Sequence, residues 1–209
     1  RMTARPVLAL RNMVIASSTA KRPKSAIERM ITPSARTGCT ARTAAAPEPL
    51  MLEPGWAGIA RIITHLGGAG ASIALSTALL VYDAPTGEMM LNATTCTAGI
   101  VEALKIGLGR ARPYVPGGSG RFTGPSLSPD YHSMPSGHTA NAFAMATVLS
   151  NRHPDWSPAL YGLALAVGLS RIELGVHWPS DVVIGAAIGL WVGRQVTEGR
   201  LRLFAFDSD

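Results

Sequence analysis

The sequence predicts an all-α fold, an up-and-down transmembrane bundle of about five helices that follows a disordered N-terminal tail. The composition supports this fold class: hydrophobic residues make up 47% of the 209 residues, charged residues only 15%, and the mean hydropathy is +0.21. After residue 55, apolar stretches of helical length alternate with Pro, Gly and charged residues. The last stretch has Gly185, Gly189 and Gly193 at intervals of four residues, a spacing that lets helices pack closely in a membrane.

Residues 1–55 are expected to form a disordered basic tail, and residues 56–205 a single membrane-embedded helical domain. The segment 1–48 contains nine Lys or Arg and two Glu, whereas residues 49–209 contain ten Lys or Arg and eleven Asp or Glu. The basic excess therefore lies in a segment too polar to fold alone, and no folded basic face with aromatics is expected to bind nucleic acid. A targeting peptide and a plain extension are both compatible with this tail.

The five helices are expected at residues 57–82, 87–108, 136–151, 158–171 and 179–200. The first contains an uncharged run, 62–82, of about the 20 residues that a membrane span needs. Pro113 limits the second helix, and Pro135 precedes the third. The fourth ends near Arg171, and Pro179 suits the first turn of the fifth. Residues 113–135 form the longest non-helical stretch, of a length that often carries function.

Two cations lie near the end of the second expected helix. Lys105 and Arg112 are seven residues apart, so on a continuous helix they would share a face. With no acid beside them, they would repel one another unless they shared an anion, and phosphate suits an Arg fork and a Lys point charge. The alternative is a pair of interfacial cations at a membrane helix end.

The third expected helix begins with Ser136, Gly137 and His138. Free amides and the positive end of the helix dipole form an anion site there, and Gly137 leaves the backbone open to an oxyanion. His138 adds a group that exchanges protons near neutral pH. Ser136 as a simple N-cap is the alternative.

His177 precedes the fifth expected helix, and Asp181 falls in its first turn. At this spacing the carboxylate can accept a hydrogen bond from one imidazole nitrogen, which leaves the other as a nucleophile. An ordinary capping pair is the alternative, although Arg171 is expected at the same level. If the helices alternate in direction, all three clusters meet at one end of the bundle, where a doubly charged phosphate would balance their cations.

Taken together, these residues resemble the three-part signature of the type 2 phosphatidic acid phosphatase and vanadium haloperoxidase superfamily. The matching segments are Lys105-x6-Arg112-Pro113, Pro135-Ser136-Gly137-His138 and Ser170-Arg171-x5-His177-x3-Asp181. The resemblance implies that His177 forms a phosphohistidine, that Asp181 orients it, and that His138 protonates the leaving alcohol. It also implies a phosphate-binding set made of Lys105, Arg112, Ser136, Gly137 and Arg171. No metal or other cofactor is expected, and vanadate should inhibit.

The expected function is therefore a multi-pass membrane phosphatase acting on a lipid or polyprenyl phosphate. A vanadate-dependent haloperoxidase is the first alternative, because its vanadate cage resembles the same signature, but known haloperoxidases are larger and soluble. A non-catalytic membrane protein that binds a lipid phosphate is the second, and the intact set of His138, His177 and Asp181 argues against it. Membrane members of the superfamily usually have six helices, one more than expected here.

Overall fold

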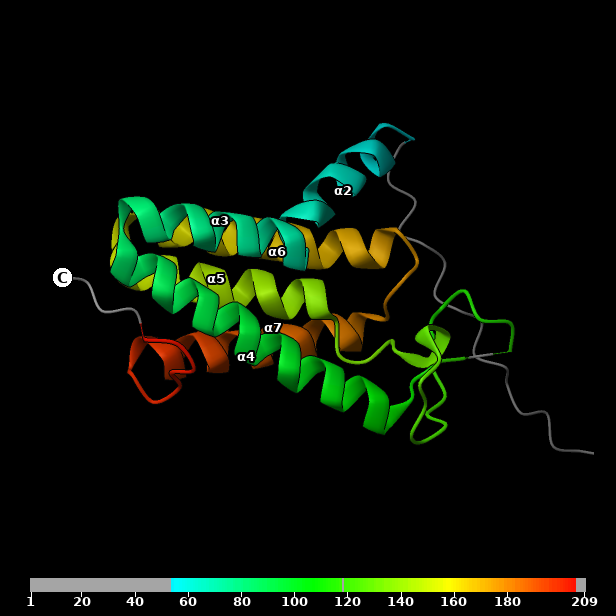
Figure 1. The fold of residues 1–209 in the computed structure, drawn as a ribbon. Helices are drawn as coiled ribbons and strands as arrows, with labels where there is room; N and C mark the ends of the chain where they lie inside the picture. The colour runs from blue at the N-terminus through cyan, green and yellow to red at the C-terminus, as the bar shows by residue number, and fades with distance from the viewer. Residues whose placement is uncertain (1–53, 118, 206–209) are drawn as a thin grey trace, which may run out of the picture. The chain divides into compact units, whose positions relative to one another are not determined.

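The computed structural model describes residues 54–205 except residue 118, and this part of the chain is all-α, as predicted (Figure 1). Its six α-helices and two short 3₁₀ helices are α2 (Pro54–Leu66), α3 (Ala69–Tyr82), α4 (Ala84–Leu108), η1 (Pro129–Tyr131), α5 (Gly137–Arg152), η2 (Pro154–Trp156), α6 (Ser157–Glu173) and α7 (Pro179–Thr197). The predicted tail, 1–55, lies almost wholly outside the described residues.

The prediction of one helix over residues 57–82 is wrong, because the chain breaks at Gly67 and Gly68 into α2 and α3, which are bent by 48°. The break packs against the start of α5: a Cβ built on Gly67 would lie 2.6 Å from the carbonyl oxygen of His138. This break accounts for the sixth helix. No single helix in the described residues is long and apolar enough to cross a membrane, and the bent α2–α3 pair passes that test together, by length and composition only.

Helix α5 lies at the centre of the bundle and packs against α3, α4, α6 and α7 (Figure 1). The glycines of α7 lie along its contact with α5, as their spacing predicts. A Cβ on Gly185 would come within 2.6 Å of the carbonyl oxygen of Ser136, and a Cβ on Gly193 within 2.6 Å of the Thr147 Cβ. Side chains on α7 at these positions would therefore separate the two helices.

Apolar side chains fill the spaces on both sides of α5. Where α4, α5 and α7 meet, the buried cluster includes Met90, Val148 and Val192, which are fully buried. Between α5 and α6, a smaller cluster contains Ala142, Ala146, Ala164 and Val167. These contacts fix the helix ends that carry the predicted site residues.

Candidate active site

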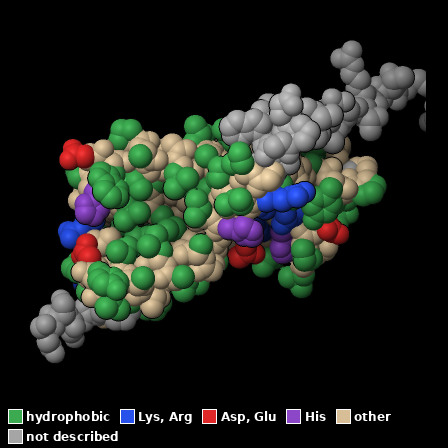
Figure 2. Space-filling model, turned by 90° about the horizontal axis from the view of Figure 1, so that it is seen from above, with side chains coloured by type: hydrophobic (Ala, Val, Ile, Leu, Met, Phe, Trp, Pro, Cys, Tyr) green, Lys and Arg blue, Asp and Glu red, His purple; other side chains and the backbone are tan. Residues whose placement is uncertain are grey.

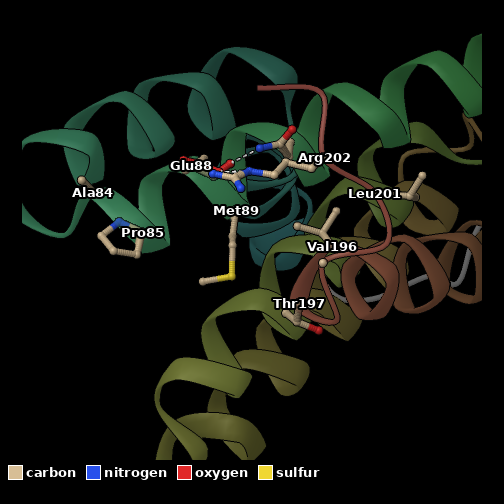
Figure 3. A pocket seen from close by; sticks show the side chains of 10 residues that line it. Ala84, Pro85, Glu88, Met89, Val196, Thr197, Leu201 and Arg202 are labelled. Atoms are coloured by element: carbon tan, nitrogen blue, oxygen red, sulfur yellow. Dashed lines mark hydrogen bonds and ion pairs between the residues drawn. The ribbon is translucent and has the colours of Figure 1, made fainter. Parts of the chain in front are cut away.

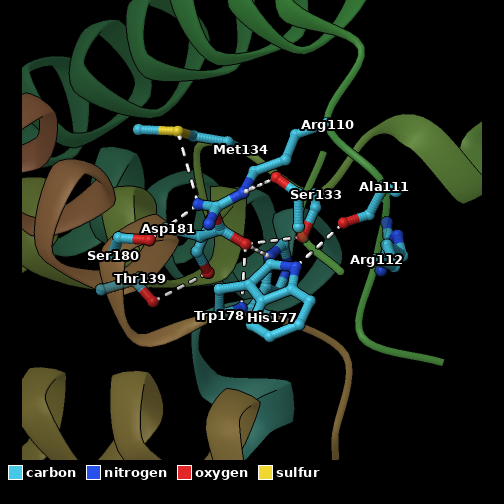
Figure 4. Close-up of polar contacts among 12 residues, drawn as sticks. Arg110, Ala111, Arg112, Ser133, Met134, Thr139, His177, Trp178, Ser180 and Asp181 are labelled. Carbon is cyan, nitrogen blue, oxygen red and sulfur yellow. Dashed lines mark hydrogen bonds and ion pairs between the residues drawn. The ribbon is translucent and has the colours of Figure 1, made fainter. Parts of the chain in front are cut away.

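The chain turns sharply between α6 and α7, and this turn carries His177. Gly175 has φ +63°, a left-handed conformation that glycine adopts without a steric penalty. His177 is 4% exposed and Asp181 is fully buried. The Nδ1 atom of His177 is buried, lies 3.4 Å from Oδ2 of Asp181 and makes no closer hydrogen bond, so the carboxylate faces it at more than typical hydrogen-bond length (Figure 4). The Nε2 atom is therefore the ring nitrogen left for chemistry.

Asp181 is held by several donors besides His177 (Figure 4). The backbone N–H of Trp178 donates to Oδ2 over 2.9 Å, as in a helix cap, and the Ser133 hydroxyl donates to the same oxygen over 2.5 Å. Arg110 forms an ion pair with Oδ1. Asp181 therefore caps α7 and faces His177 at the same time, so the two interpretations of the His177–Asp181 spacing are compatible.

The sequence analysis did not identify Arg110, although it is the cation that pairs with Asp181. Its Nη1 also donates to the Ser180 hydroxyl over 2.7 Å, and its Nε to the carbonyl oxygen of Gly120 over 3.2 Å. The guanidinium carbon lies 5.7 Å from the centre of the Trp178 ring. The only sequence signal was a second arginine two residues before Arg112, and a repeated cation alone does not reveal a buried partner.

The first turn of α5 lies against the start of α7. Ser136 is fully buried, and its N–H donates to the carbonyl oxygen of Asp181 over 3.0 Å. Its hydroxyl pairs with the Thr139 hydroxyl at 2.9 Å instead of capping a backbone amide. The first helical hydrogen bond runs from Ala140 N to Ser136 O, so the amides before it have no acceptor within the helix. These amides lie where the sequence predicts an anion site.

Lys105 and Arg112 do not lie on one continuous helix, in keeping with the expected end of the second helix at residue 108. Helix α4 ends at Leu108, because Gly109 adopts a left-handed conformation with φ +54°. Arg112 therefore lies in the following loop, where its Nε donates to the carbonyl oxygen of Pro129 over 3.1 Å. The expectation that no acid lies beside these cations is wrong, since Lys105 Nζ pairs with Glu102 at 2.6 Å.

The structure nevertheless brings the predicted cations to one end of the bundle. A Cβ built on Gly137 would lie 3.4 Å from Lys105 Nζ, so this ammonium group lies against the first turn of α5. Arg171, near the end of α6, donates from Nη1 to the Thr64 hydroxyl of α2 over 2.7 Å, and its buried Nε has no hydrogen-bond partner. Thr64 is a second contact that the sequence did not reveal.

His138 lies among these groups. Arg171, His177, Lys105 and His65 all lie within electrostatic range of its imidazole. His65, which the sequence placed only on a helix face, thus lies near the site. All eight predicted site residues converge where α4 ends, α5 begins, α6 ends and α7 begins.

Burial lowers the pKa of His177 below its usual value, and the positive charges of Arg112 and Arg171 lower it further, whereas the Asp181 carboxylate opposes the shift. The imidazole is therefore neutral at neutral pH and keeps a free lone pair on Nε2. A neutral imidazole near two arginines is suited to attack a bound tetrahedral anion.

The model of the PAP2 superfamily matches residues 87–202, which is more than half of the chain and contains every predicted site residue. The chain belongs to the PAP2 superfamily.

Its PAP2 relatives include the lipid A 1-phosphatase of Rhizobium etli, 30% identical over 138 residues, which cover 64% of this chain and 60% of that protein. The undecaprenyl-diphosphatase of Sulfolobus acidocaldarius is 38% identical over 65 residues, 31% of this chain and 32% of that protein. The chain thus matches less than two thirds of the length of these curated relatives.

Two solved structures share this arrangement of helices. LpxE of Aquifex aeolicus superposes with a TM-score of 0.61 at 26% identity, covering 72% of this chain and 90% of that one. The transmembrane PAP2 type phosphatidylglycerolphosphate phosphatase of Bacillus subtilis superposes with a TM-score of 0.58 at 25% identity, covering 78% of this chain and 85% of that one.

A separate pocket of about 330 Å³ lies at the other end of the PAP2 bundle, between the start of α4 and the segment after α7 (Figure 3). Met89 and Val196 line it, and Arg202 forms an ion pair with Glu88 at 2.7 Å across its wall. None of the predicted site residues lines this pocket.

Proposed function

We propose that this PAP2 protein is a multi-pass membrane phosphatase that hydrolyses a phosphate monoester or pyrophosphate of a lipid or polyprenyl substrate through a phosphohistidine. One observation carries the proposal. His177 is buried, has Nδ1 3.4 Å from Asp181, and lies within electrostatic range of Arg112, Arg171 and His138 at the end of the bundle where a phosphate would bind.

In the first step, Nε2 of His177 attacks the phosphorus atom, and the bond from phosphorus to the ester or anhydride oxygen breaks. His138 donates a proton to the departing oxygen. In the second step, a water molecule attacks phosphorus, the P–N bond breaks, and His138 takes the proton that the water loses. Inorganic phosphate leaves, and both imidazoles return to their starting states.

The surrounding donors would stabilise the negative charge of the phosphoryl oxygens in both steps. Lys105, Arg112 and Arg171 supply positive charge, and the amides at Gly137 and His138 supply directed N–H groups. Such preorganised donors are a large source of rate enhancement for phosphoryl transfer. Because the donor set is already cationic, the reaction is proposed to need no metal ion.

The surface of the bundle supports a membrane location. Large apolar side chains are exposed on several helices, among them Ile62, Val81, Leu165, Leu169, Val183 and Trp191. In Figure 2, apolar side chains cover much of the face between two separated groups of charged residues. Exposed apolar area on this scale is typical of a surface that contacts lipid or protein. The names of the relatives, a lipid A 1-phosphatase, an undecaprenyl-diphosphatase and a transmembrane phosphatase, support the same location and substrate class.

The test is phosphate release in detergent from a panel of lipid, polyprenyl and soluble phosphates, by the wild type and by His177→Ala. The variant should lose at least a thousandfold in kcat. His153→Ala is the matched control, because His153 is exposed after α5, at the other end of the bundle. This variant should keep the kcat of the wild type. Full activity in His177→Ala would refute the mechanism, and halide oxidation with vanadate and peroxide, without phosphate release, would establish the haloperoxidase alternative.

Rapid quenching with a radiolabelled substrate tests the intermediate itself. A phosphohistidine has a P–N bond, so the label should stay on the protein in alkali and be lost in acid. Label that survives acid, or label on His177→Ala, would exclude this intermediate.

A further inference from the structure

We infer that Thr64, on α2, is a positioning residue that holds the guanidinium group of Arg171 in place for the phosphate. The inference rests on the proposed phosphatase function and adds a residue on which that function depends. Thr64 lies outside residues 87–202, the part of the chain that the PAP2 model matches, so the family match assigns it no role. Arg171 lies 107 residues later, in the last turn of α6.

The contact between Thr64 and Arg171 is short and enclosed. Nη1 of Arg171 donates to the Thr64 hydroxyl over 2.7 Å, and Thr64 is only 6% exposed. Helix α2 packs against α6, and this hydrogen bond joins the two helices at the end of α6 (Figure 1). Among the residues that the structure describes, Thr64 alone accepts a hydrogen bond from this guanidinium group. Without the hydroxyl, the Arg171 side chain would be free to turn away from the site.

Thr64 is itself held at the break between α2 and α3. Its carbonyl oxygen accepts the N–H of Gly67 over 3.2 Å, and the Gly67 carbonyl oxygen accepts a side-chain N–H of Asn141 on α5 over 3.3 Å. The break fits closely against the first turn of α5, because a Cβ on Gly67 would lie 2.6 Å from the carbonyl oxygen of His138. The Thr64 hydroxyl is thus fixed relative to the start of α5, and it fixes the Arg171 guanidinium group there too.

Thr64 orients Arg171 without neutralising it, since a hydroxyl is an uncharged acceptor. Within residues 54–205, apart from residue 118, no Asp or Glu forms an ion pair with Arg171. Arg112 likewise donates from Nε to an uncharged acceptor, a backbone carbonyl oxygen. By contrast Arg110, which is not a predicted phosphate ligand, pairs with the carboxylate of Asp181. Arg112 and Arg171 therefore keep their positive charge for an anion.

The orientation of Arg171 matters because a guanidinium group binds phosphate through parallel N–H groups of a planar fork. A fork that is already held in the binding orientation loses less conformational entropy when the anion arrives. It also needs no reorganisation to stabilise the phosphoryl oxygens in the transition state. Loss of the Thr64 hydroxyl should therefore weaken the binding of phosphate and of its mimic vanadate, and lower kcat/KM.

The experiment compares the wild type with Thr64→Val, which keeps the shape of the side chain, and with Thr64→Ser, which keeps the hydroxyl. The measurements are kcat/KM for the lipid phosphate that the wild type hydrolyses fastest, and the inhibition constant of vanadate. We expect Thr64→Val to lower kcat/KM about tenfold and to raise the vanadate constant about tenfold, as for loss of a hydrogen bond to a charged group, and Thr64→Ser to stay within about threefold of the wild type. The inhibition constant does not depend on the fraction of enzyme that is folded, so it separates positioning from stability.

Thr147→Val is the matched control, because the Thr147 hydroxyl of α5 also accepts a hydrogen bond from a side chain of α6, that of Tyr161 over 3.2 Å. These two residues line a different pocket, beside Arg194 in the last turn of α7, and the control should leave both quantities unchanged. In an Arg171→Ala background, Thr64→Val should cause no further loss of kcat/KM, since no guanidinium group is left to position.

Thr64→Asp tests the need for an uncharged acceptor. Its carboxylate would pair with Arg171 and compete with the anion, so the vanadate constant should rise above that of Thr64→Val. A constant no higher than that of Thr64→Val would contradict this part of the inference.

The positioning role would be overturned by an unchanged vanadate constant in Thr64→Val, or by a loss in Thr64→Ser as large as that in Thr64→Val. The same shift in Thr147→Val, or an undiminished loss in the Arg171→Ala background, would also overturn it. Each of these results would leave the phosphatase proposal intact. Failure of the wild type to release phosphate from every substrate of the panel would instead overturn the proposed function and the positioning role with it.

Discussion

Replacing Gly185 by alanine tests whether the close packing of α5 and α7 sets the geometry of the site. The new Cβ would lie 2.6 Å from the carbonyl oxygen of Ser136 and 3.4 Å from its carbonyl carbon and Cβ. Ordinary van der Waals contact would require a separation of roughly 0.7 Å more at this point. Ser136 is the residue before α5, and its N–H bonds to Asp181, so the shift would fall on the site itself.

The expected cost combines two opposing terms. Overpacking a helix interface costs about 1–3 kcal/mol, and replacing a helical glycine by alanine returns about 1 kcal/mol. The net change is a loss of about 1 kcal/mol in the free energy of unfolding. Because the α5 amides would move relative to His177 by a large fraction of an ångström, kcat/KM should fall about 10- to 100-fold.

Two matched variants separate packing from catalysis. Gly193→Ala makes a similar clash two turns along α7, 2.6 Å from the Thr147 Cβ, and should lower stability with little loss of kcat/KM. Gly162→Ala, in α6, meets nothing within 4 Å and should stabilise by about 1 kcal/mol. Thermal melting in detergent and phosphate release well below the melting temperature measure the two effects. Equal kcat/KM in Gly185→Ala and Gly193→Ala would refute the reasoning.

Four further outcomes are expected. Asp181→Asn should lower kcat by about three orders of magnitude, measured by phosphate release, since it removes the charge that orients His177. Arg110→Gln should lower the free energy of unfolding by about 3 kcal/mol in a melting experiment, because it leaves the buried Asp181 carboxylate without its cation; unchanged stability would contradict the ion pair. Because the pKa of His177 is lowered, a pH profile of kcat/KM should lose activity only below the usual histidine pKa of about 6.5, and an acid limb above that value would contradict a neutral nucleophile. Vanadate should inhibit phosphate release, whereas a chelator should not; loss of activity with chelator and recovery with added metal would refute the metal-free mechanism.

Sequence reasoning succeeded where a feature depends on local spacing. The interval from His177 to Asp181 is one helical turn, so their proximity follows from the chain itself. The four-residue repeat of Gly185 and its successors likewise predicted a close helix contact, and α5 is the helix that they meet. Alternating helix directions then brought the three clusters to one end without any knowledge of side-chain contacts.

Sequence reasoning failed where a helix boundary depends on a contact with a residue far away in the sequence. In the sequence, Gly67 and Gly68 are two poor helix formers within an apolar stretch. Only the carbonyl oxygen of His138, about 70 residues later, shows why a side chain is excluded at Gly67. Periodicity alone cannot reveal this contact.

Arg110 shows why the site needs more residues than its signature contains. A buried carboxylate that faces a histidine would pull a proton onto the imidazole if nothing else balanced its charge. The ion pair with Arg110 and the hydrogen bonds from Ser133 and Trp178 balance the charge of Asp181. Asp181 can therefore face His177 at 3.4 Å and orient it without drawing a proton onto its imidazole. The main chain of Asp181 also accepts the N–H of Ser136, so the residue that orients the nucleophile also positions the anion-binding end of α5. A substitution that moves Asp181 should therefore impair binding of the phosphate and attack on it together.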